Sequence, residues 1–154
     1  MRKSVIAGTH QLLEEEWLEI ERVASVQVTS EQPDFPIESA FGPAQGPGWR
    51  AASAGPQLIR VVFDHPRSLR RIQLRFSETE IARTQEFTLR WVASPTRAAK
   101  EIVRQQWNFS PQGSTSEIED YQVDLTGVSV LELSLKPDLS DANAVASLAS
   151  FRIV

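Results

Sequence analysis

The sequence predicts an all-β protein folded as an antiparallel β-sandwich of about eight strands. Two observations carry this prediction. Apolar and polar residues alternate along most of the chain, which is the pattern of strands that have one buried and one solvent-facing side. Clusters rich in Gly, Pro, Ser and Asp separate these segments at intervals of roughly 10 to 17 residues, which is typical of turns between strands. The sequence contains no internal repeat and no low-complexity tract.

Each predicted strand is defined by a set of residues that share one face. These sets are Ala24, Val26 and Val28; Ile59, Val61 and Phe63; Ile72, Leu74 and Phe76; Phe87, Leu89 and Trp91; Val103, Gln105, Trp107 and Phe109; Tyr121, Val123 and Leu125; Leu131, Leu133 and Leu135; and Ala149, Phe151 and Ile153. Turns or loops are expected at 30–41, 64–66, 77–85, 111–116, 126–127 and 138–144.

The N-terminal part has two interpretations. Leu13, Trp17 and Ile20 have helical spacing, so 9–22 would form an amphipathic helix capped by Thr9. Alternatively, only residues near 10–16 are helical and Trp17 begins a short strand that ends at Ile20. We favour the second interpretation, which makes residues 1–16 an N-terminal segment and residues 17–154 the sandwich domain.

Composition limits the classes of function. The chain has 154 residues, which suits one domain. Its net charge of −4 and pI of about 5.2 argue against a nucleic-acid partner. There is no cysteine, so the chain can form neither a disulfide nor a thiolate metal site. The first residues lack a secretory apolar region, and no segment has the roughly 20 apolar residues that span a bilayer. We therefore expect a cytoplasmic protein without a membrane partner.

The stretch from Ala40 to Phe63 supplies the most distinctive pattern. A loop containing Gly42, Gly46 and Gly48 runs into Trp49, and a second break at Gly55 precedes the apolar strand that ends before Asp64. This order of alanine, glycine-rich loop, tryptophan, second loop and buried strand resembles the entry of a discoidin-like, or galactose-binding-like, β-sandwich of the coagulation factor 5/8 type C family. The resemblance covers about residues 17–154 and is a pattern of loops and strands, with no fixed signature.

The resemblance implies a jelly-roll sandwich that takes ligands with the loops at one of its ends. Another jelly-roll or an immunoglobulin-like sandwich is the rival fold. Family members usually have Asp-Gly after the alanine that matches Ala40, whereas Phe41 and Gly42 follow it here. This departure puts a structural calcium ion near the loop in doubt. Calcium held by Asp34 or Glu31 together with backbone carbonyls would leave no mark in the sequence.

Catalytic chemistry has little support. The two histidines are His10, in a polar segment, and His65, in a predicted turn. No G-x-S-x-G nucleophile motif is present, and neither is a zinc or calcium motif. The carboxylate pairs Glu78 with Glu80 and Glu117 with Glu119 would each share a face on a strand, but their polar surroundings favour solvated charges. We therefore predict no enzyme activity, no cofactor and no metal site.

Carbohydrate recognition needs flat apolar surface and planar hydrogen-bonding groups. The candidate ligand-binding residues near predicted loops are Trp49, Arg50, Arg83, Gln85, Arg104, Gln106 and Trp107. Arg83 is the strongest candidate because arginine is seldom buried, whereas Trp49 and Trp107 could instead belong to the core. We therefore predict a non-catalytic module that binds a carbohydrate or a similar polar small ligand. The alternative is a domain for protein interaction or homo-oligomerisation. Arg67, Arg70, Arg71 and Arg75 could form a basic patch for an anionic sugar, a phosphate or the acidic surface of a partner, but pairing with Glu and Asp of neighbouring strands is the favoured interpretation.

Overall fold

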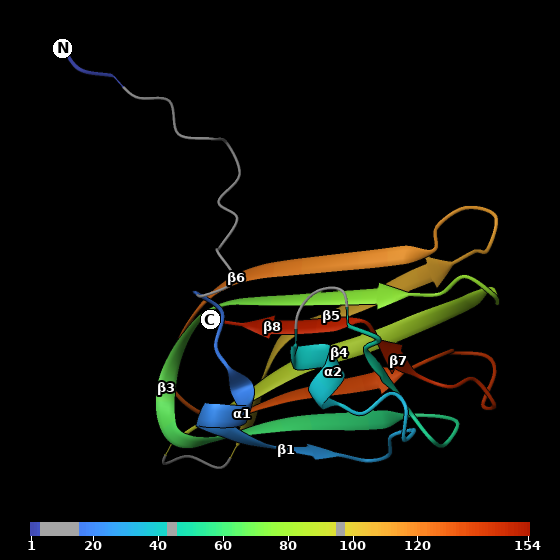
Figure 1. The fold of residues 1–154 in the computed structure, drawn as a ribbon, viewed down its shortest axis with the longest axis horizontal. Helices are drawn as coiled ribbons and strands as arrows, with labels where there is room; N and C mark the ends of the chain where they lie inside the picture. Colours follow the sequence, from blue (N-terminus) through green and yellow to red (C-terminus); the bar gives the residue numbers. More distant parts are fainter. Residues whose placement is uncertain (4–15, 43–45, 95–97) are drawn as a thin grey trace.

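The computed structural model describes residues 1–3, 16–42, 46–94 and 98–154, and these form an antiparallel β-sandwich with two very short helices (Figure 1). The predicted fold class is confirmed. The elements are α1 (Ile20–Val23), β1 (Ala24–Val28), α2 (Glu38–Phe41), β2 (Trp49–Arg50), β3 (Gln57–Ser77), β4 (Arg83–Ala93), β5 (Ala99–Phe109), β6 (Ser116–Lys136), β7 (Ser147–Leu148) and β8 (Ser150–Ile153).

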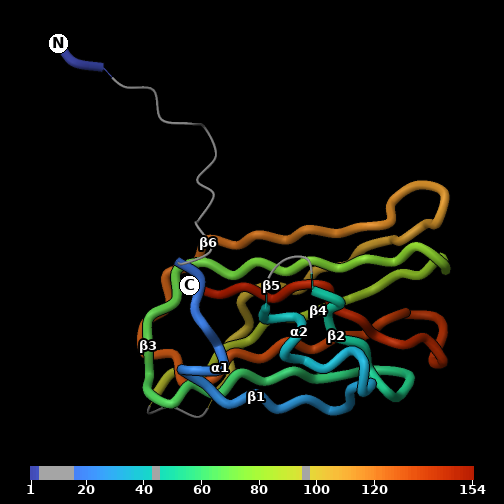
Figure 2. Tube along the Cα trace, viewed as in Figure 1, coloured from blue at the N-terminus to red at the C-terminus, as the bar shows by residue number. Residues whose placement is uncertain are grey.

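Two long strands, β3 and β6, connect the layers of the sandwich. They pair with each other along most of their lengths and bend together where their register shifts, between Val62 and Arg71 of β3. One layer holds β1, the first half of β3, the second half of β6, β4 and β5. The other layer holds the first half of β6, the second half of β3, and β8. Figure 2 shows the bend of β3 at the end of the molecule opposite most of the loops.

The bends replace two predicted turns. Residues 64–66 lie within β3 and residues 126–127 lie within β6, so the chain continues in the other layer at both places. Gly127 has φ +70°, a conformation that glycine adopts without strain. The predicted strand from Trp17 to Ile20 is wrong, because α1 begins at Ile20. The helix expected near residues 10–16 lies outside the described residues.

The core lies between the layers and is formed by the alternating residues of the sequence. Ile59 and Val61 from one layer and Ile72 and Leu74 from the other have no exposed surface. Each such side chain contributes about 1.5–3 kcal/mol by leaving water. The buried positions alternate along β3 on both sides of its bend. The period of two in the sequence therefore identified the inner faces correctly.

The two flanks of the sandwich differ. The covered flank lies between β1 and β8 (Figures 1 and 2). There α1, β2, and α2 with the residue before it add Ile20, Trp49, Ala40 and Ile37 to the buried core. The open flank lies between β5 and residues 116–125 of β6. Among the described residues, no further strand pairs with the outer edge of either segment. Apolar side chains on their inner faces, such as Trp107 and Tyr121, are only partly buried.

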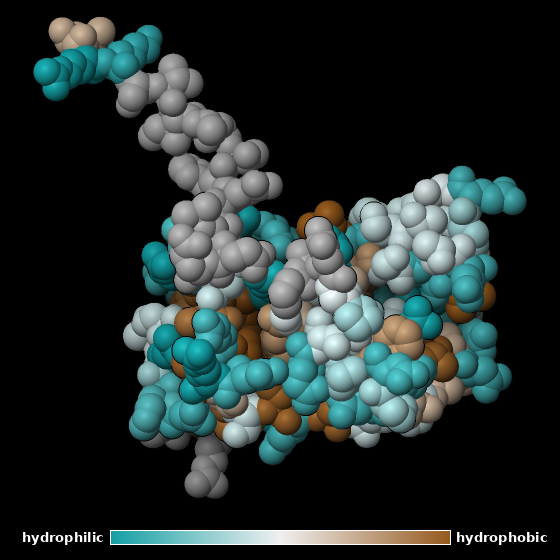
Figure 3. Space-filling model, viewed as in Figure 1, coloured by the Kyte–Doolittle hydropathy of each residue, from teal (hydrophilic) through white to brown (hydrophobic). Residues whose placement is uncertain are grey.

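The surface is mixed in character. In the view of Figure 3, hydrophilic residues cover most of the described surface and apolar residues are scattered among them. Neither helix of the described chain is long and apolar enough to cross a membrane.

Candidate functional site

A cleft of about 500 Å³ opens at one end of the sandwich. Its walls come from β2, from the loop between β3 and β4, and from the loop between β6 and β7. These segments lie at the end where β3 and β6 finish, on the right in Figure 1. The cleft therefore brings together three parts of the chain that are far apart in sequence.

The short strand β2 is fixed at the cleft by a glycine that precedes it. Gly48 has φ +76°, and a Cβ atom there would lie 2.7 Å from the backbone oxygen of Leu148. The backbones of β2 and β7 therefore approach closely and pair, with Trp49 opposite Leu148. Because successive side chains of a strand point to opposite sides, Trp49 enters the core and Arg50 faces solvent.

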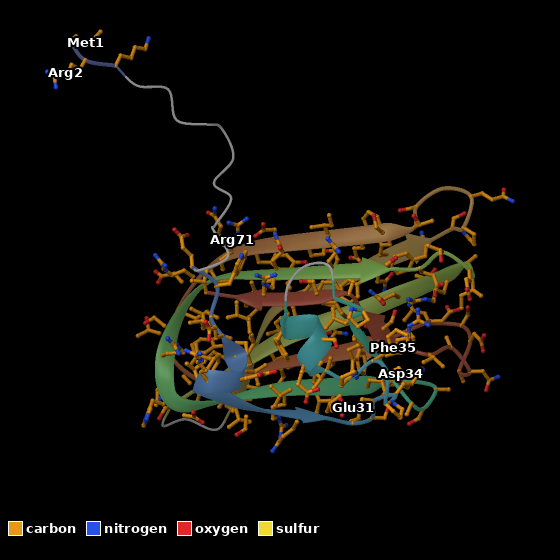
Figure 4. All side chains as sticks on the ribbon, in the orientation of Figure 1. Met1, Arg2, Glu31, Asp34, Phe35 and Arg71 are labelled. Atoms are coloured by element: carbon orange, nitrogen blue, oxygen red, sulfur yellow. The ribbon has the colours of Figure 1, made fainter. Side chains whose placement is uncertain are left out.

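Arg50 is held in place by an aromatic ring. Its guanidinium carbon lies 4.5 Å from the centroid of the Phe35 ring. Phe35, which is labelled in Figure 4, lies on the loop that joins β1 to α2. The backbone of this loop is tied to β2, because Arg50 N donates to Phe35 O at 3.2 Å and Gln32 N donates to Arg50 O at 2.9 Å. No side-chain acceptor or carboxylate among the described residues pairs with the Arg50 guanidinium. Its donors are therefore available to a ligand.

The wall between β3 and β4 is organised by Glu78. One carboxylate oxygen, Oε2, accepts hydrogen bonds from the backbone amides of Glu80 at 3.1 Å and Ile81 at 3.5 Å. The other, Oε1, accepts from Nε of Arg83 at 2.8 Å. Burial works to raise the pKa of Glu78, but the hydrogen bonds from Arg83 and the two amides outweigh it, and the pKa lies below its ordinary value. Glu78 is therefore a charged anchor for this wall.

The wall between β6 and β7 presents mixed chemistry. The carboxylate of Asp141 accepts a hydrogen bond from Asn143 N at 2.9 Å, which closes a tight turn and leaves the Asn143 side chain exposed. Val145, from this wall, and Ile81, from the facing one, are 41% and 46% exposed. The cleft thus combines a free guanidinium, an amide, the Glu80 carboxylate and small apolar surfaces.

Two predicted site residues, Arg83 and Gln85, are buried. The expected loop at 77–85 ends earlier, and both residues lie on the inner face of β4. Arg83 is 4% exposed and Gln85 is fully buried. Arginine can be buried here because Glu78 pairs with it and because Phe109 lies against its guanidinium, 4.8 Å from ring centroid to carbon. Neither side chain reaches the solvent, which corrects their assignment as direct ligand contacts.

Trp49 is also a core residue. It is 1% exposed, and its indole nitrogen donates to the backbone oxygen of Ser30 at 3.0 Å. The core interpretation of this tryptophan is therefore the correct one, and Trp49 offers no exposed ring to a sugar. Arg50 is the one candidate that the structure places at the cleft with an exposed side chain.

The remaining three candidates lie on β5, away from the cleft. Arg104 and Gln106 point to the outer face of the sheet, where both contact the carboxylate of Glu86, at 3.6 Å and 2.8 Å. The Gln106 hydrogen bond is the main cause that holds the pKa of Glu86 below its ordinary value. Trp107 points the opposite way, into the open flank. Arg104 and Gln106 therefore lie on one face of β5 and Trp107 on the other, although the three residues are close in sequence.

Three cleft residues were not among the predicted site residues: Ile81, Asn143 and Val145. They lie in or beside the loops predicted at 77–85 and 138–144, but no local pattern distinguishes them. The acidic pair Glu117 and Glu119 was expected to be solvated, yet it lies on β6, and Glu117 is 1% exposed. Within the described part of the chain, no three acidic or histidine side chains are grouped so as to hold a metal ion. Glu31 instead accepts a hydrogen bond from Ile37 N at 2.8 Å.

The fold is shared with carbohydrate-binding modules. A pectin-binding module superposes with a TM-score of 0.59 at 16% identity, covering 85% of this chain and 89% of the module. The family 32 module of C. perfringens NanJ, in complex with galactose, gives 0.60 at 13% identity and covers 89% and 96%. Another family 32 module from Clostridium perfringens, in complex with GalNAc-β-1,3-galactose, gives 0.62 at 13% and covers 89% and 98%.

No protein-family model and no curated protein matches the sequence of this chain. Some of the matched structures are larger proteins; a Ruminococcus gnavus fucosidase is matched over 25% of its length. At these identities the likeness establishes the β-sandwich fold that the chain shares with these modules.

Proposed function

We propose that the protein is a non-catalytic binding module that takes a carbohydrate in the cleft at the end of the sandwich. The observation that carries this proposal is the Arg50 guanidinium, which is stacked on Phe35 and has no acidic partner among the described residues. A planar donor of this kind can form paired hydrogen bonds with neighbouring hydroxyls or with a carboxylate. The shared fold with carbohydrate-binding modules supports the same conclusion.

The other cleft residues suit the remaining surface of a sugar. The amide of Asn143 can donate and accept hydrogen bonds, and the carboxylate of Glu80 accepts them. Ile81 and Val145 offer apolar contact to C–H groups. No fully exposed aromatic ring lines the described part of the cleft. We therefore expect binding that depends strongly on hydrogen bonds and is weak for a single sugar unit.

Affinity electrophoresis through gels containing pectin or chitosan, with galactose as a soluble competitor, tests the proposal. The wild-type protein should be retarded in at least one gel. Arg50→Ala should run as it does in a gel without polysaccharide, because the variant lacks the free donors. Arg104→Ala is the matched control, since it also removes one exposed arginine, and it should behave like the wild type.

Two results would count against the proposal. Equal retardation of Arg50→Ala and the wild type would mean that the polysaccharide does not bind at the cleft through Arg50. No retardation in any gel, together with an elution volume on gel filtration that depends on protein concentration, would favour the alternative of an interaction or oligomerisation domain.

A further inference from the structure

A continuous chain of polar side chains runs from the cleft into the open flank. It begins at Glu78, whose Oε1 accepts from Arg83 Nε at 2.8 Å. Arg83 Nη1 then donates to Gln85 Oε1 at 3.1 Å, and Gln85 Nε2 donates to Glu117 Oε1 at 3.3 Å. The last bond joins β4 to β6 and so connects the two layers of the sandwich. Such a chain is unusual in a core that is otherwise apolar.

The far end of the chain is a pair of carboxyl groups. Glu117 and Glu119 lie on the same face of β6, and the hydroxyl of Tyr121 donates to Glu119 Oε2 at 3.0 Å. Glu117 Oε2 is buried and has no donor, and its carboxyl neighbour Glu119 is itself an acceptor. A proton on Glu117 turns this atom into a donor to Glu119 and completes the chain. Burial, followed by the contact with Glu119, raises the pKa of Glu117 to about 8.

The polar atoms that lack partners are concentrated in the same place. Among the described residues, the buried side-chain atoms without a hydrogen bond are Arg83 Nη2, Trp107 Nε1 and Glu117 Oε2. All three side chains project from β4, β5 and β6 toward the space between the layers. Buried polar atoms without partners cost free energy. We therefore expect the hydrogen bonds among these side chains to change when Glu117 becomes charged.

Among the residues that the structure describes, few charged groups surround Glu117. Arg83 faces it from β4, and Glu119 and Tyr121 face it from its own strand. The neighbouring positions on β3 and β5 are uncharged: Phe76 is paired with Glu117, and Trp107 is paired with Gln85. Within the described part of the chain, Arg83 is therefore the one cation that lies between Glu78 on one side and Glu117 on the other.

We propose that Arg83 is a positioning residue for the cleft, and that the protonation of Glu117 decides how firmly Arg83 holds Glu78 and the wall at 79–81. While Glu117 is neutral, Arg83 stays hydrogen-bonded to Glu78. Glu78 in turn accepts hydrogen bonds from the amides of Glu80 and Ile81. When Glu117 ionises, it competes for the guanidinium and repels Glu119. The anchor of the wall then weakens. The effect on ligand affinity rests on the proposed function of the cleft, whereas the movement of the wall does not.

Carbon-detected NMR tests the coupling without a ligand, because it follows carboxyl and backbone carbons in alkaline solution. The Glu117 carboxyl carbon is titrated from pH 5 to pH 9.5, together with the backbone signals of Glu80 and Ile81. In the wild type, the backbone signals should change with the same midpoint as Glu117. In Glu117→Gln, which keeps the shape of the side chain but cannot ionise, they should stay constant over that range.

A second variant separates positioning from folding. Glu78→Gln removes the charge that holds Arg83, so the wall signals should shift even at pH 6. Glu132→Gln is the matched control, because Glu132 forms a comparable ion pair with Arg60, 2.7 Å apart, in the middle of the sheet. It should leave the wall signals unchanged. The inference is wrong if the wall signals of the wild type do not change with the midpoint of Glu117, or if the same signals change equally over this pH range in Glu117→Gln.

Affinity provides the second readout. For whichever of pectin, chitosan or galactose binds, the Kd of the wild type should be about fivefold or more higher at pH 9.5 than at pH 6. A change of this size corresponds to a modest coupling between two sites. Glu117→Gln should show less than half of this change. If the wall titrates but none of these carbohydrates binds, the coupling stands and the proposed function fails. If a carbohydrate binds and the wall does not titrate, the proposed function stands and the coupling fails.

Discussion

The covered flank and the open flank solve the same structural problem in different ways. Both lie between two edge strands of a sandwich, where the inner faces would otherwise meet water. On the covered flank, α1, α2 and β2 bring in apolar side chains such as Ile37 and Trp49, and these are almost fully buried. On the open flank, Trp107 and Tyr121 stay partly exposed. The polar chain from Glu78 to Glu119 extends into this flank.

The difference shows that chain inserted between strands can decide where a sandwich is rigid. A flank that is filled by inserted apolar segments gains stability from each apolar group that it buries. A flank without such a cover can accommodate polar groups whose protonation changes with pH. The cleft lies at the end of the molecule where both arrangements contribute, because Trp49 and Arg50 come from the insertion and Glu78 comes from the polar chain.

The largest expected difference between the two flanks is in the loss of stability when a tryptophan is removed from each. Trp49→Ala should lower the free energy of unfolding by about 3–5 kcal/mol, because it leaves a cavity in a closed core. Trp107→Ala should cost clearly less, since the ring is partly exposed and water can reach the space. Chemical denaturation of both variants measures the difference. Equal losses would mean that the open flank is as tightly packed as the covered one.

A smaller effect is expected from the pH dependence of stability. The folded-state pKa of Glu117, about 8, lies above the ordinary value of 4.5, so the folded protein binds a proton more tightly than the unfolded chain. Stability should therefore fall as the pH rises from about 4.5 to 8, and Glu117→Gln should remove this fall and be more stable by about 1–3 kcal/mol at pH 9. Denaturation of the two proteins at pH 5, 7 and 9 measures it.

Other carboxyl groups act in a separate pH range. The pKa values of Glu78, Glu86, Asp120 and Asp138 lie below their ordinary values, so the stability that these groups contribute is lost only as the solution becomes acidic. Parallel pH profiles of the wild type and Glu117→Gln above pH 5 would contradict the assignment of a neutral Glu117.

The junction between β2 and β7 should be sensitive to a single methyl group. Gly48→Ala would place a Cβ atom 2.7 Å from a backbone oxygen at a positive φ, so we expect a loss of about 1–2 kcal/mol or more. Gly113→Ala is the matched control, because the nearest atoms to its Cβ are 3.9 Å away and belong to a side chain. Thermal unfolding compares the two. A stable Gly48→Ala variant would show that β2 can move away from β7.

The smallest effect concerns the outer face of the sheet. Arg104 is half exposed and lies 3.6 Å from the Glu86 carboxylate. An ion pair in such a place is worth about 0–1 kcal/mol, so Arg104→Ala should scarcely change the midpoint of unfolding at 0.1 M salt. A large loss of stability in this variant would mean that the network around Glu86 supports the fold.

The sequence predicts the layers well because alternation is a local signal. The buried residues of β3 and β6 follow a period of two, and the glycine-rich approach to Trp49 marks the insertion before β3. The bends at 64–66 and 126–127 were predicted as turns, since Pro66 and Gly127 interrupt strands in most settings. Their continuation as strands depends on the pairing of β3 with β6, which joins residues far apart in the chain.

The site was predicted less well for a related reason. Arg83 was expected on the surface because a buried arginine needs partners, and its partners are not apparent from the sequence: Glu78 is near but Glu117 is 34 positions away. Arg50 was identified because it follows Trp49 on a short strand. Asn143 and Val145 join it only when the loop after β6 folds back beside β2.

The central claim is that ligands bind at the cleft and not at the open flank. The most direct measurement is a map of backbone NMR shifts during titration with galactose and with oligogalacturonates prepared from pectin. The account predicts that the signals that move belong to residues 49–50, 79–81 and 143–147. Shifts concentrated instead in β5 and in residues 116–125 would place the binding surface on the open flank and contradict it.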